Sequence, residues 1–240
     1  MTTTTWWAAD NGVGGAITVS TPATPVAGHG LIAFLGVGSG QVLTSVQAKD
    51  AGAANVGAAW TQCAGGTQGV IQAWYLPNCP AGIASVLGTL PGSAPATLFI
   101  VDIDDLLTAA PYDSSPGQRQ QTTVTTFISL TSAAMAQARE IAFAVGYSAN
   151  NPALITGAEA GWTLAAGTGI TSGLHDVSST TSMQLEYKIF TAGGTAAAGG
   201  SCLVSADPFS AIYLFKLQAA AAPGGVANNE RLGIKLGIGI

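Results

Sequence analysis

The sequence has 240 residues and a formal net charge of −5, with 48% apolar residues but only 8% charged residues. Its seven lysines and arginines are too few to form the clustered cations that bind phosphate groups, which excludes a nucleic-acid-binding surface. The sequence contains no run of about 18 apolar residues, so we expect no membrane span. The amino terminus lacks the basic region and apolar core of a secretory signal. The apolar residues suffice for a sizeable core. A surface with so few charges favours either a protein that belongs to an assembly or one that is chemically inert.

Short strand-like segments recur along the chain, separated by glycine, proline, serine and asparagine. In residues 183–190 the odd positions are apolar and the even positions mostly polar, which is the period of a half-buried strand. Residues 211–217 are apolar at nearly every position, which predicts a central strand covered on both faces. The predicted strands are Ala16–Ser20, Leu31–Val37, Val42–Gln47, Ala58–Cys63, Val70–Leu76, Ala84–Leu90, Ala96–Ile103, Thr122–Leu130, Glu140–Tyr147, Trp162–Ala166, Ser182–Phe190, Ser201–Val204 and Ala211–Leu217.

Helical patterns are poor, and only Asp104–Ala110 and Ser132–Arg139 could hold a turn or two. The 32 glycines and 11 prolines lie mostly between the predicted strands. Many short strands joined by tight turns are typical of all-β proteins. The sequence therefore predicts an all-β fold, a two-sheet antiparallel β-sandwich over residues 16–220 with an extended arm at each end.

The predicted amino-terminal arm covers residues 1–15 and contains two adjacent tryptophans, Trp6 and Trp7. Successive side chains of a strand point to opposite faces, so both rings cannot face one core. One interpretation places one ring against a partner or a loop. The alternative buries one ring and uses the other to cap the end of the sandwich.

The predicted carboxy-terminal arm covers residues 221–240, where a breaker-rich linker precedes a strand-like segment. From 231 to 240 every even position is apolar and every odd position is glycine or a cation. A tethered apolar strand is a template for adding a strand to another sheet, which predicts a docking arm. The alternative is an edge strand that folds back on its own domain. The apolar residues of the arm are Leu232, Ile234, Leu236, Ile238 and Ile240.

The acidic residues and histidines do not predict a catalytic site. Asp102, Asp104 and Asp105 could bind a cation in a loop, but they lack the spacing of an EF-hand, and a solvated loop or a helix cap is the favoured interpretation. His175 and Asp176 lie near serines, yet no Gly-x-Ser-x-Gly motif supplies a nucleophile on a sharp turn. We therefore expect no catalytic residue, no cofactor and no metal ion.

The three cysteines, Cys63, Cys79 and Cys202, are an odd number without a secretory signal, which does not indicate a disulfide framework. Two alternatives stay open for Cys63 and Cys79. They either face each other as a bridge across neighbouring strands or remain buried thiols.

The order of the segments resembles a loose family of jelly-roll β-sandwich domains found in bacteriophage virion proteins and in some bacterial surface proteins. The resemblance covers about residues 16 to 217, and its Trp-Thr and Trp-Tyr-x-Pro motifs mark core packing and a strand exit. It implies a jelly-roll fold, a virion location and a role in decoration, fibre or tail. The residues that carry it are Gly30–Leu35, Ser45, Val46, Ala59–Thr61, Gln72–Gly82, Ser85, Val86, Asp102, Glu140–Phe143, Gly161–Thr163 and Ala211–Lys216.

The resulting hypothesis is a non-enzymatic structural protein of a bacteriophage particle, a capsid decoration or head/tail accessory protein. Its expected partners are like subunits and other virion proteins, bound through the two arms in a homo-oligomer. The alternative is a carbohydrate-binding or host-adhesion module that contacts surface polysaccharide. That alternative predicts an exposed aromatic platform, for which Trp60, Trp74, Tyr75 and Trp162 are the candidates.

Overall fold

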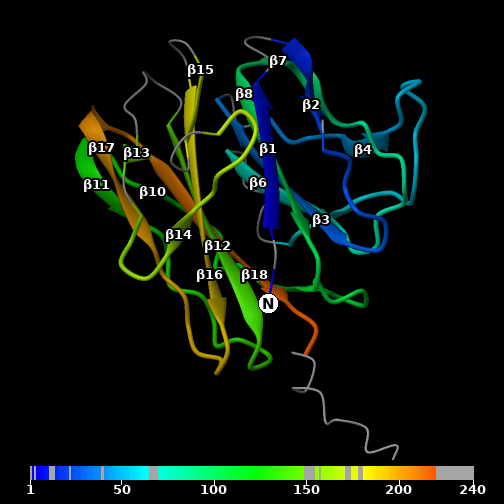
Figure 1. The fold of residues 1–240 in the computed structure, drawn as a ribbon. Helices are drawn as coiled ribbons and strands as arrows, with labels where there is room; N and C mark the ends of the chain where they lie inside the picture. Colours follow the sequence, from blue (N-terminus) through cyan, green and yellow to red (C-terminus); the bar gives the residue numbers. More distant parts are fainter. Residues whose placement is uncertain are drawn as a thin grey trace, which may run out of the picture.

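The computed structural model describes residues 2–219 apart from residues 3, 11–13, 22, 39–40, 65–69, 149–154, 157, 171–173 and 178–180. Every strand pair in this part of the chain is antiparallel, and the predicted all-β sandwich fold is confirmed. The strands lie in four sheets, so the chain contains two sandwiches where the sequence predicted one. Figure 1 shows the two sandwiches side by side, with β1–β8 on one side and β10–β18 on the other.

The first eight strands build the first sandwich, the N-sandwich. Its inner sheet has the order β1-β8-β3-β6-β5, and its outer sheet has the order β2-β7-β4. The bounds are β1 Thr4–Asp10, β2 Gly14–Ser20, β3 Gly30–Val37, β4 Ser45–Lys49, β5 Thr61–Gln62, β6 Ile71–Leu76, β7 Ser85–Ala94 and β8 Ala96–Ile103.

The remaining strands build the second sandwich, the C-sandwich. Its inner sheet has the order β10-β18-β12-β16-β14, with β15 beside β16 and β9 beside β18, and its outer sheet has the order β11-β17-β13. The bounds are β9 Tyr112–Ser114, β10 Gln118–Gln120, β11 Val124–Ile128, β12 Glu140–Ser148, β13 Ile155–Thr156, β14 Thr163–Leu164, β15 Leu174–Val177, β16 Thr181–Phe190, β17 Gly199–Ala206 and β18 Phe209–Lys216.

The two sandwiches have the same strand order. The inner order β1-β8-β3-β6-β5 is matched strand for strand by β10-β18-β12-β16-β14, and the outer order β2-β7-β4 is matched by β11-β17-β13. Both follow the jelly-roll pattern, in which the first and last strands of each unit lie side by side in one sheet. The chain therefore contains one topology twice, in tandem.

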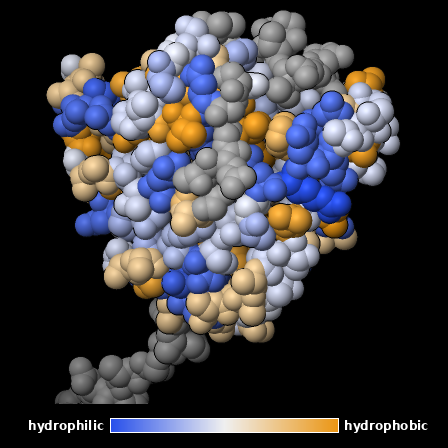
Figure 2. Space-filling model, turned by 180° about the vertical axis from the view of Figure 1, so that it is seen from behind, coloured by the Kyte–Doolittle hydropathy of each residue, from blue (hydrophilic) through white to orange (hydrophobic). Residues whose placement is uncertain are grey.

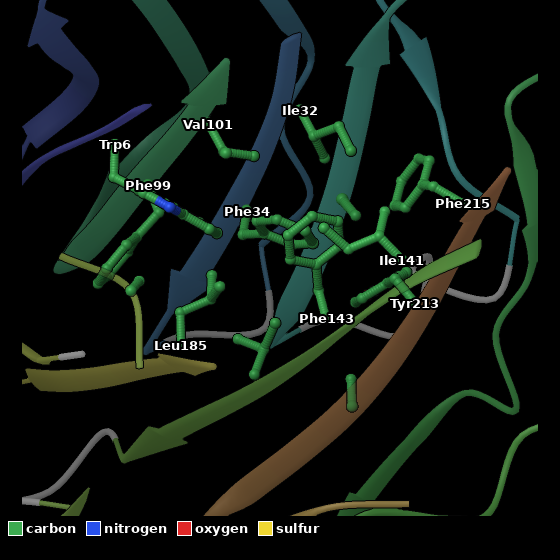
Figure 3. Close-up of a cluster of buried hydrophobic side chains, with 14 of the residues drawn as sticks. Trp6, Ile32, Phe34, Phe99, Val101, Ile141, Phe143, Leu185, Tyr213 and Phe215 are labelled. Carbon is green, nitrogen blue, oxygen red and sulfur yellow. The ribbon is translucent and has the colours of Figure 1, made fainter. Parts of the chain in front are cut away.

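The inner sheets of the two sandwiches pack face to face over a shared aromatic core (Figure 3). Phe34 of β3 and Phe143 of β12 meet across it, with ring centroids 5.0 Å apart. Gly36 permits this close packing, because a Cβ atom there would lie 2.2 Å from the Tyr147 ring. The shared core joins the two units into one body. Its labelled members in Figure 3 are Trp6, Ile32, Phe34, Phe99, Val101, Ile141, Phe143, Leu185, Tyr213 and Phe215.

The inner sheet of the N-sandwich is covered on both faces. One face of β3 and β8 contributes to the shared core, and the other face contributes Leu31, Leu35 and Ile100 to the interior of the N-sandwich. All eight residues of each strand are buried. The prediction of a doubly covered central strand is confirmed for β18, whose Tyr213 lies in the shared core while Leu214 faces the other way.

Residues 4–10 of the predicted amino-terminal arm form strand β1, which is paired along its whole length with β8. These residues are therefore part of the sandwich and not of an arm. Trp6 is 2% exposed and lies in the shared core, whereas Trp7 is 1% exposed and lies in the interior of the N-sandwich. Two adjacent tryptophans are both buried because their sheet has a core on each face. Their prediction as partner-binding residues is therefore wrong.

The segments predicted to hold helical turns contain no helix, since residues 104–110 and 132–139 are turns, bends and irregular chain. Arg139 in the second segment joins three parts of the molecule. Its guanidinium donates hydrogen bonds to the Asp105 carboxylate, to the Thr2 hydroxyl at 2.7 Å and to the Gln218 carbonyl. This contact fastens the amino terminus, the connection between the sandwiches and the end of β18. No helix in the described residues is long and apolar enough to cross a membrane.

Candidate functional site

A groove of about 400 Å³ lies over the outer sheet of the C-sandwich, and it is the candidate binding site of the molecule. Strands β11 and β17 form its floor, and residues 158–159 form one wall. The register places Thr126 beside Ser201 and Ile128 beside Gly199. The lining combines amide, hydroxyl and carboxylate groups with three apolar side chains. The lining residues are Gln121, Thr126, Phe127, Ile128, Ala158, Glu159, Gly199, Gly200 and Ser201.

Gln121 holds one side of the groove in place. Its Oε1 accepts a hydrogen bond of 2.7 Å from the backbone N–H of Ile128. This contact satisfies a donor on β11, which pairs with β17 on its other side. Ile128 itself is 45% exposed, so its apolar side chain remains open to a partner.

Polar side chains of the inner sheet lie beneath the groove. A small cavity bordered by Gln184, Glu186 and Ser210 shares Phe127 and Gly199 with the groove lining. Glu186 is 2% exposed, and its Oε2 accepts a hydrogen bond of 2.9 Å from the backbone N–H of Glu159. The contact connects the buried carboxyl group to the wall of the groove.

The pKa of Glu186 is raised to about 7, chiefly by burial. The hydrogen bond from the Glu159 backbone opposes this rise, and the negative charge of Glu159 adds to it. A buried carboxyl group in such surroundings favours its neutral form. Glu186 can therefore hold a proton near neutral pH. Because its side chain is almost fully buried, it is placed to support Glu159 and not to contact a ligand directly.

The three acidic residues singled out in the sequence do not converge on one site. Asp102 accepts hydrogen bonds from His29 Nδ1 at 2.7 Å and from the backbone N–H of Val26 at 3.0 Å. Asp105 belongs to the Arg139 cluster. Within the described ranges, no three His, Cys, Asp or Glu side chains form a group that could hold a metal ion.

The His29–Asp102 pair is not predictable from the sequence, because the two residues lie 73 positions apart in the chain. Cys79 lies nearby, and its Sγ donates to the Val26 carbonyl at 3.0 Å. Burial and the Asp102 charge raise the pKa of this thiol to about 11. Since a nucleophilic cysteine needs a lowered pKa, this neighbourhood serves as a clamp that holds residues 26–29 against β8.

The cysteines are free thiols, and each is buried. Cys63 lies in the shared core, whereas Cys79 lies in the interior of the N-sandwich. These positions lie on opposite faces of the same inner sheet. The structure thus decides between the two alternatives in favour of buried thiols.

A second acidic cluster, which the sequence does not predict, closes one end of the C-sandwich. Glu140 is fully buried, and its Oε1 accepts a hydrogen bond of 2.9 Å from the backbone N–H of Gln137. Lys216 Nζ lies 3.6 Å from Asp113 Oδ1. Burial raises the pKa of Glu140, and the Asp113 charge adds to this rise. These groups join β9, β12 and β18 and give the cluster a structural role.

The aromatic residues proposed for sugar stacking belong to the cores. Trp60 and Trp162 are buried at matching places, just before β5 and just before β14. Trp74 and Tyr75 are half-buried and pack against the two cores. The large exposed apolar side chains in the described part of the chain are Val26, Ile128, Leu130 and Val204, none of them aromatic. The platform that the carbohydrate-binding alternative predicted is thus not found among these residues.

The remaining residues singled out in the sequence are the His175–Asp176 pair and the carboxy-terminal arm. His175 and Asp176 lie in β15, where they pair with Met183 and Ser182 of β16. The five apolar residues of the carboxy-terminal arm, Leu232, Ile234, Leu236, Ile238 and Ile240, lie outside the described residues.

Comparisons with known proteins give no family for this chain. No family model and no curated protein matches it. Among solved structures it is similar to PA5104, a conserved protein of unknown function from Pseudomonas aeruginosa PAO1. That similarity has a TM-score of 0.28 and 12% sequence identity, and it covers 88% of this chain and 79% of the other.

Proposed function

We propose that this chain is a non-enzymatic structural protein of a bacteriophage virion, a capsid decoration or head/tail accessory protein that assembles through residues 231–240. The observation that carries the proposal is the shared aromatic core, which joins two jelly-roll units into one stiff body. A body of this kind suits a building block, since its two units keep a fixed orientation under load. The virion setting is supported by the resemblance to phage jelly-roll domains.

The surface of the body is consistent with a chain that works inside an assembly. Figure 2 shows small apolar areas distributed among hydrophilic ones on the face in view, with no single large apolar area. With few charges to keep copies apart, association can depend on a dedicated segment. The arm supplies that segment, and its five apolar side chains offer about 1.5–3 kcal/mol each before ordering costs.

The proposal assigns assembly to one of the two predicted arms, the carboxy-terminal one. Strand β1 is an integral member of its sheet, so the amino-terminal residues do not serve as a second docking arm. Assembly through the carboxy-terminal arm alone is the form of the proposal that agrees with the described residues.

Deletion of residues 228–240 tests the proposal. We expect the truncated chain to keep its near-ultraviolet circular dichroism and its unfolding midpoint, because every described strand remains. In light scattering the full chain is expected to be a defined oligomer and the truncation a single protomer. An unchanged mass together with normal incorporation into particles would contradict the proposal.

A further inference from the structure

Three of the four exposed large apolar side chains in the described residues belong to the outer sheet of the C-sandwich or follow it directly. Ile128 lies in β11, Leu130 lies two residues beyond it, and Val204 lies in β17; their exposed fractions are 45%, 38% and 49%. The fourth, Val26, lies in the N-sandwich clamp and is 55% exposed. The groove described above opens on this outer sheet, and Ile128 is the member of the three that lines it.

We propose that the groove over β11 and β17 is the receptor for residues 231–240 of a neighbouring copy of this chain. The inference rests on the proposed function and adds the surface to which the arm binds. The geometry that supports it is the juxtaposition, in one groove, of exposed Ile128 with the exposed residue Glu159.

The chemistry of the arm complements this groove. The sequence from 231 to 240 alternates apolar residues with glycine or a cation, the cations being Arg231 and Lys235. An extended segment with this pattern presents its apolar side chains on one face and its cations on the other. The apolar face can cover Ile128 while a cation reaches the rim at Glu159. In a chain with only seven lysines and arginines, two of them fall in this ten-residue segment.

The backbone at the groove also suits an extended partner. Strand β17 begins with Gly199 and Gly200, both in the groove lining. Gly199 pairs with the exposed Ile128, so no side chain stands above the floor at this position. A Cβ atom at Gly200 would lie 2.7 Å from the Phe127 ring, so this glycine makes room for Phe127. The arm carries glycine at 233, 237 and 239. Glycine on both sides permits the backbones to approach closely.

The buried layer beneath the groove positions the acidic wall. The Glu186 carboxyl group holds the backbone of Glu159 by their 2.9 Å hydrogen bond. Gln121 fixes the opposite side through Ile128. Both sides of the groove are thus held from within the C-sandwich before the arm arrives, which lowers the ordering cost of binding.

The experiment measures the mass of the full chain by light scattering over a concentration series, for the wild type and a set of variants. Ile128→Lys places a cation in the groove, and Leu236→Lys removes an apolar residue from the arm. We expect each to weaken association at least tenfold. Val26→Lys is the matched control, because it changes an exposed apolar residue of similar exposure on the other sandwich, and its dissociation constant is expected to stay within twofold of the wild type.

Exchanging the charges of Glu159 and Lys235 tests whether these two residues contact each other. Recovery of association in the double variant would not result from a general change of the surface. Glu159→Lys is expected to weaken association about tenfold, and adding Lys235→Glu to the same chain is expected to restore most of it. Thermal unfolding of each variant, within about 2 °C of the wild type, shows that the body is intact.

The results separate this inference from the proposed function. If Leu236→Lys lowers the mass while Ile128→Lys and Glu159→Lys do not, the arm binds elsewhere, and the inference is overturned while the proposed function stands. A wild-type chain that remains a single protomer at all concentrations overturns both the inference and self-assembly through the arm. Loss of association in the groove variants and the arm variant, with rescue by the charge exchange, supports the inference.

Discussion

The interiors of the two sandwiches differ although their strand orders match. Leu35 and Ala144 occupy the same place, one residue beyond Phe34 and Phe143 on the third strand of each unit. In the N-sandwich the interior is filled by large apolar side chains, whereas the C-sandwich has small residues near a polar cavity. The topology therefore fixes which positions face inward but not what chemistry they carry.

A matched pair of polar residues makes the contrast concrete. Gln72 pairs with Leu35, and Glu186 pairs with Ala144, in equivalent registers. Gln72 is fully buried and uses both ends of its amide, accepting from the backbone N–H of Leu43 at 2.9 Å and donating to the Gln41 carbonyl at 2.7 Å. Gln72 is a neutral amide that holds residues 41–43 by hydrogen bonds. Glu186 is a titratable acid that holds Glu159 in the groove wall.

The strongest test of the apolar interior is Leu35→Ala. Leu35 is fully buried among large neighbours, so the substitution leaves a cavity, and we expect a loss of about 3–5 kcal/mol in the free energy of unfolding. Urea unfolding followed by tryptophan fluorescence measures it. The exposed residue Ile128 is the control, and Ile128→Ala is expected to change stability by about 0.5 kcal/mol or less. Similar losses in the two variants would contradict the packing contrast.

The polar interior predicts a pH dependence. The folded state raises the pKa of Glu186 to about 7, from an ordinary value of 4.5. The unfolded chain therefore loses this proton at lower pH, so the contribution of Glu186 is present below about pH 4.5 and is lost as the pH rises towards 7. The expected loss is at most about 3 kcal/mol, since one pKa unit corresponds to about 1.4 kcal/mol.

Glu186→Gln gives the C-sandwich the amide found at Gln72, and it checks this prediction. Urea unfolding between pH 4.5 and 7.5 is expected to show a smaller slope of stability against pH in the variant. A residual slope of the same sign is expected from Glu140, whose pKa is also raised by burial. An identical slope in the variant and the wild type would show that Glu186 is ionised in the folded protein.

The smallest expected effect concerns the amide of the N-sandwich. Gln72→Ala removes both hydrogen bonds and leaves the backbone N–H of Leu43 without its partner, for a loss of about 1–3 kcal/mol. Unlike the Glu186 contribution, this loss is expected to be independent of pH between 4.5 and 7.5. Parallel urea titrations at the two pH values measure it, and a loss that varies with pH would contradict the contrast between the two sites.

Much of the fold could be predicted from the sequence. Three predicted strands lie within a residue or two of β3, β8 and β18, namely Leu31–Val37, Ala96–Ile103 and Ala211–Leu217. Apolar or alternating runs of this length between turn-forming residues are typical of buried strands. The candidate site was less predictable. Glu159 and Glu186 lie far apart in the chain, and only the tertiary fold brings the backbone of one to the carboxyl group of the other.

The sequence by itself determined the all-β class, the position of most strands and the two-sided burial of the last one. Tertiary structure alone decided that the strands form two sandwiches instead of one and that Trp6 and Trp7 are both buried. It also decided that Cys63 and Cys79 lie in different cores. The physical reason is that a period of two assigns side chains to faces of a strand, whereas the layer that covers each face is set by contacts between segments distant in sequence.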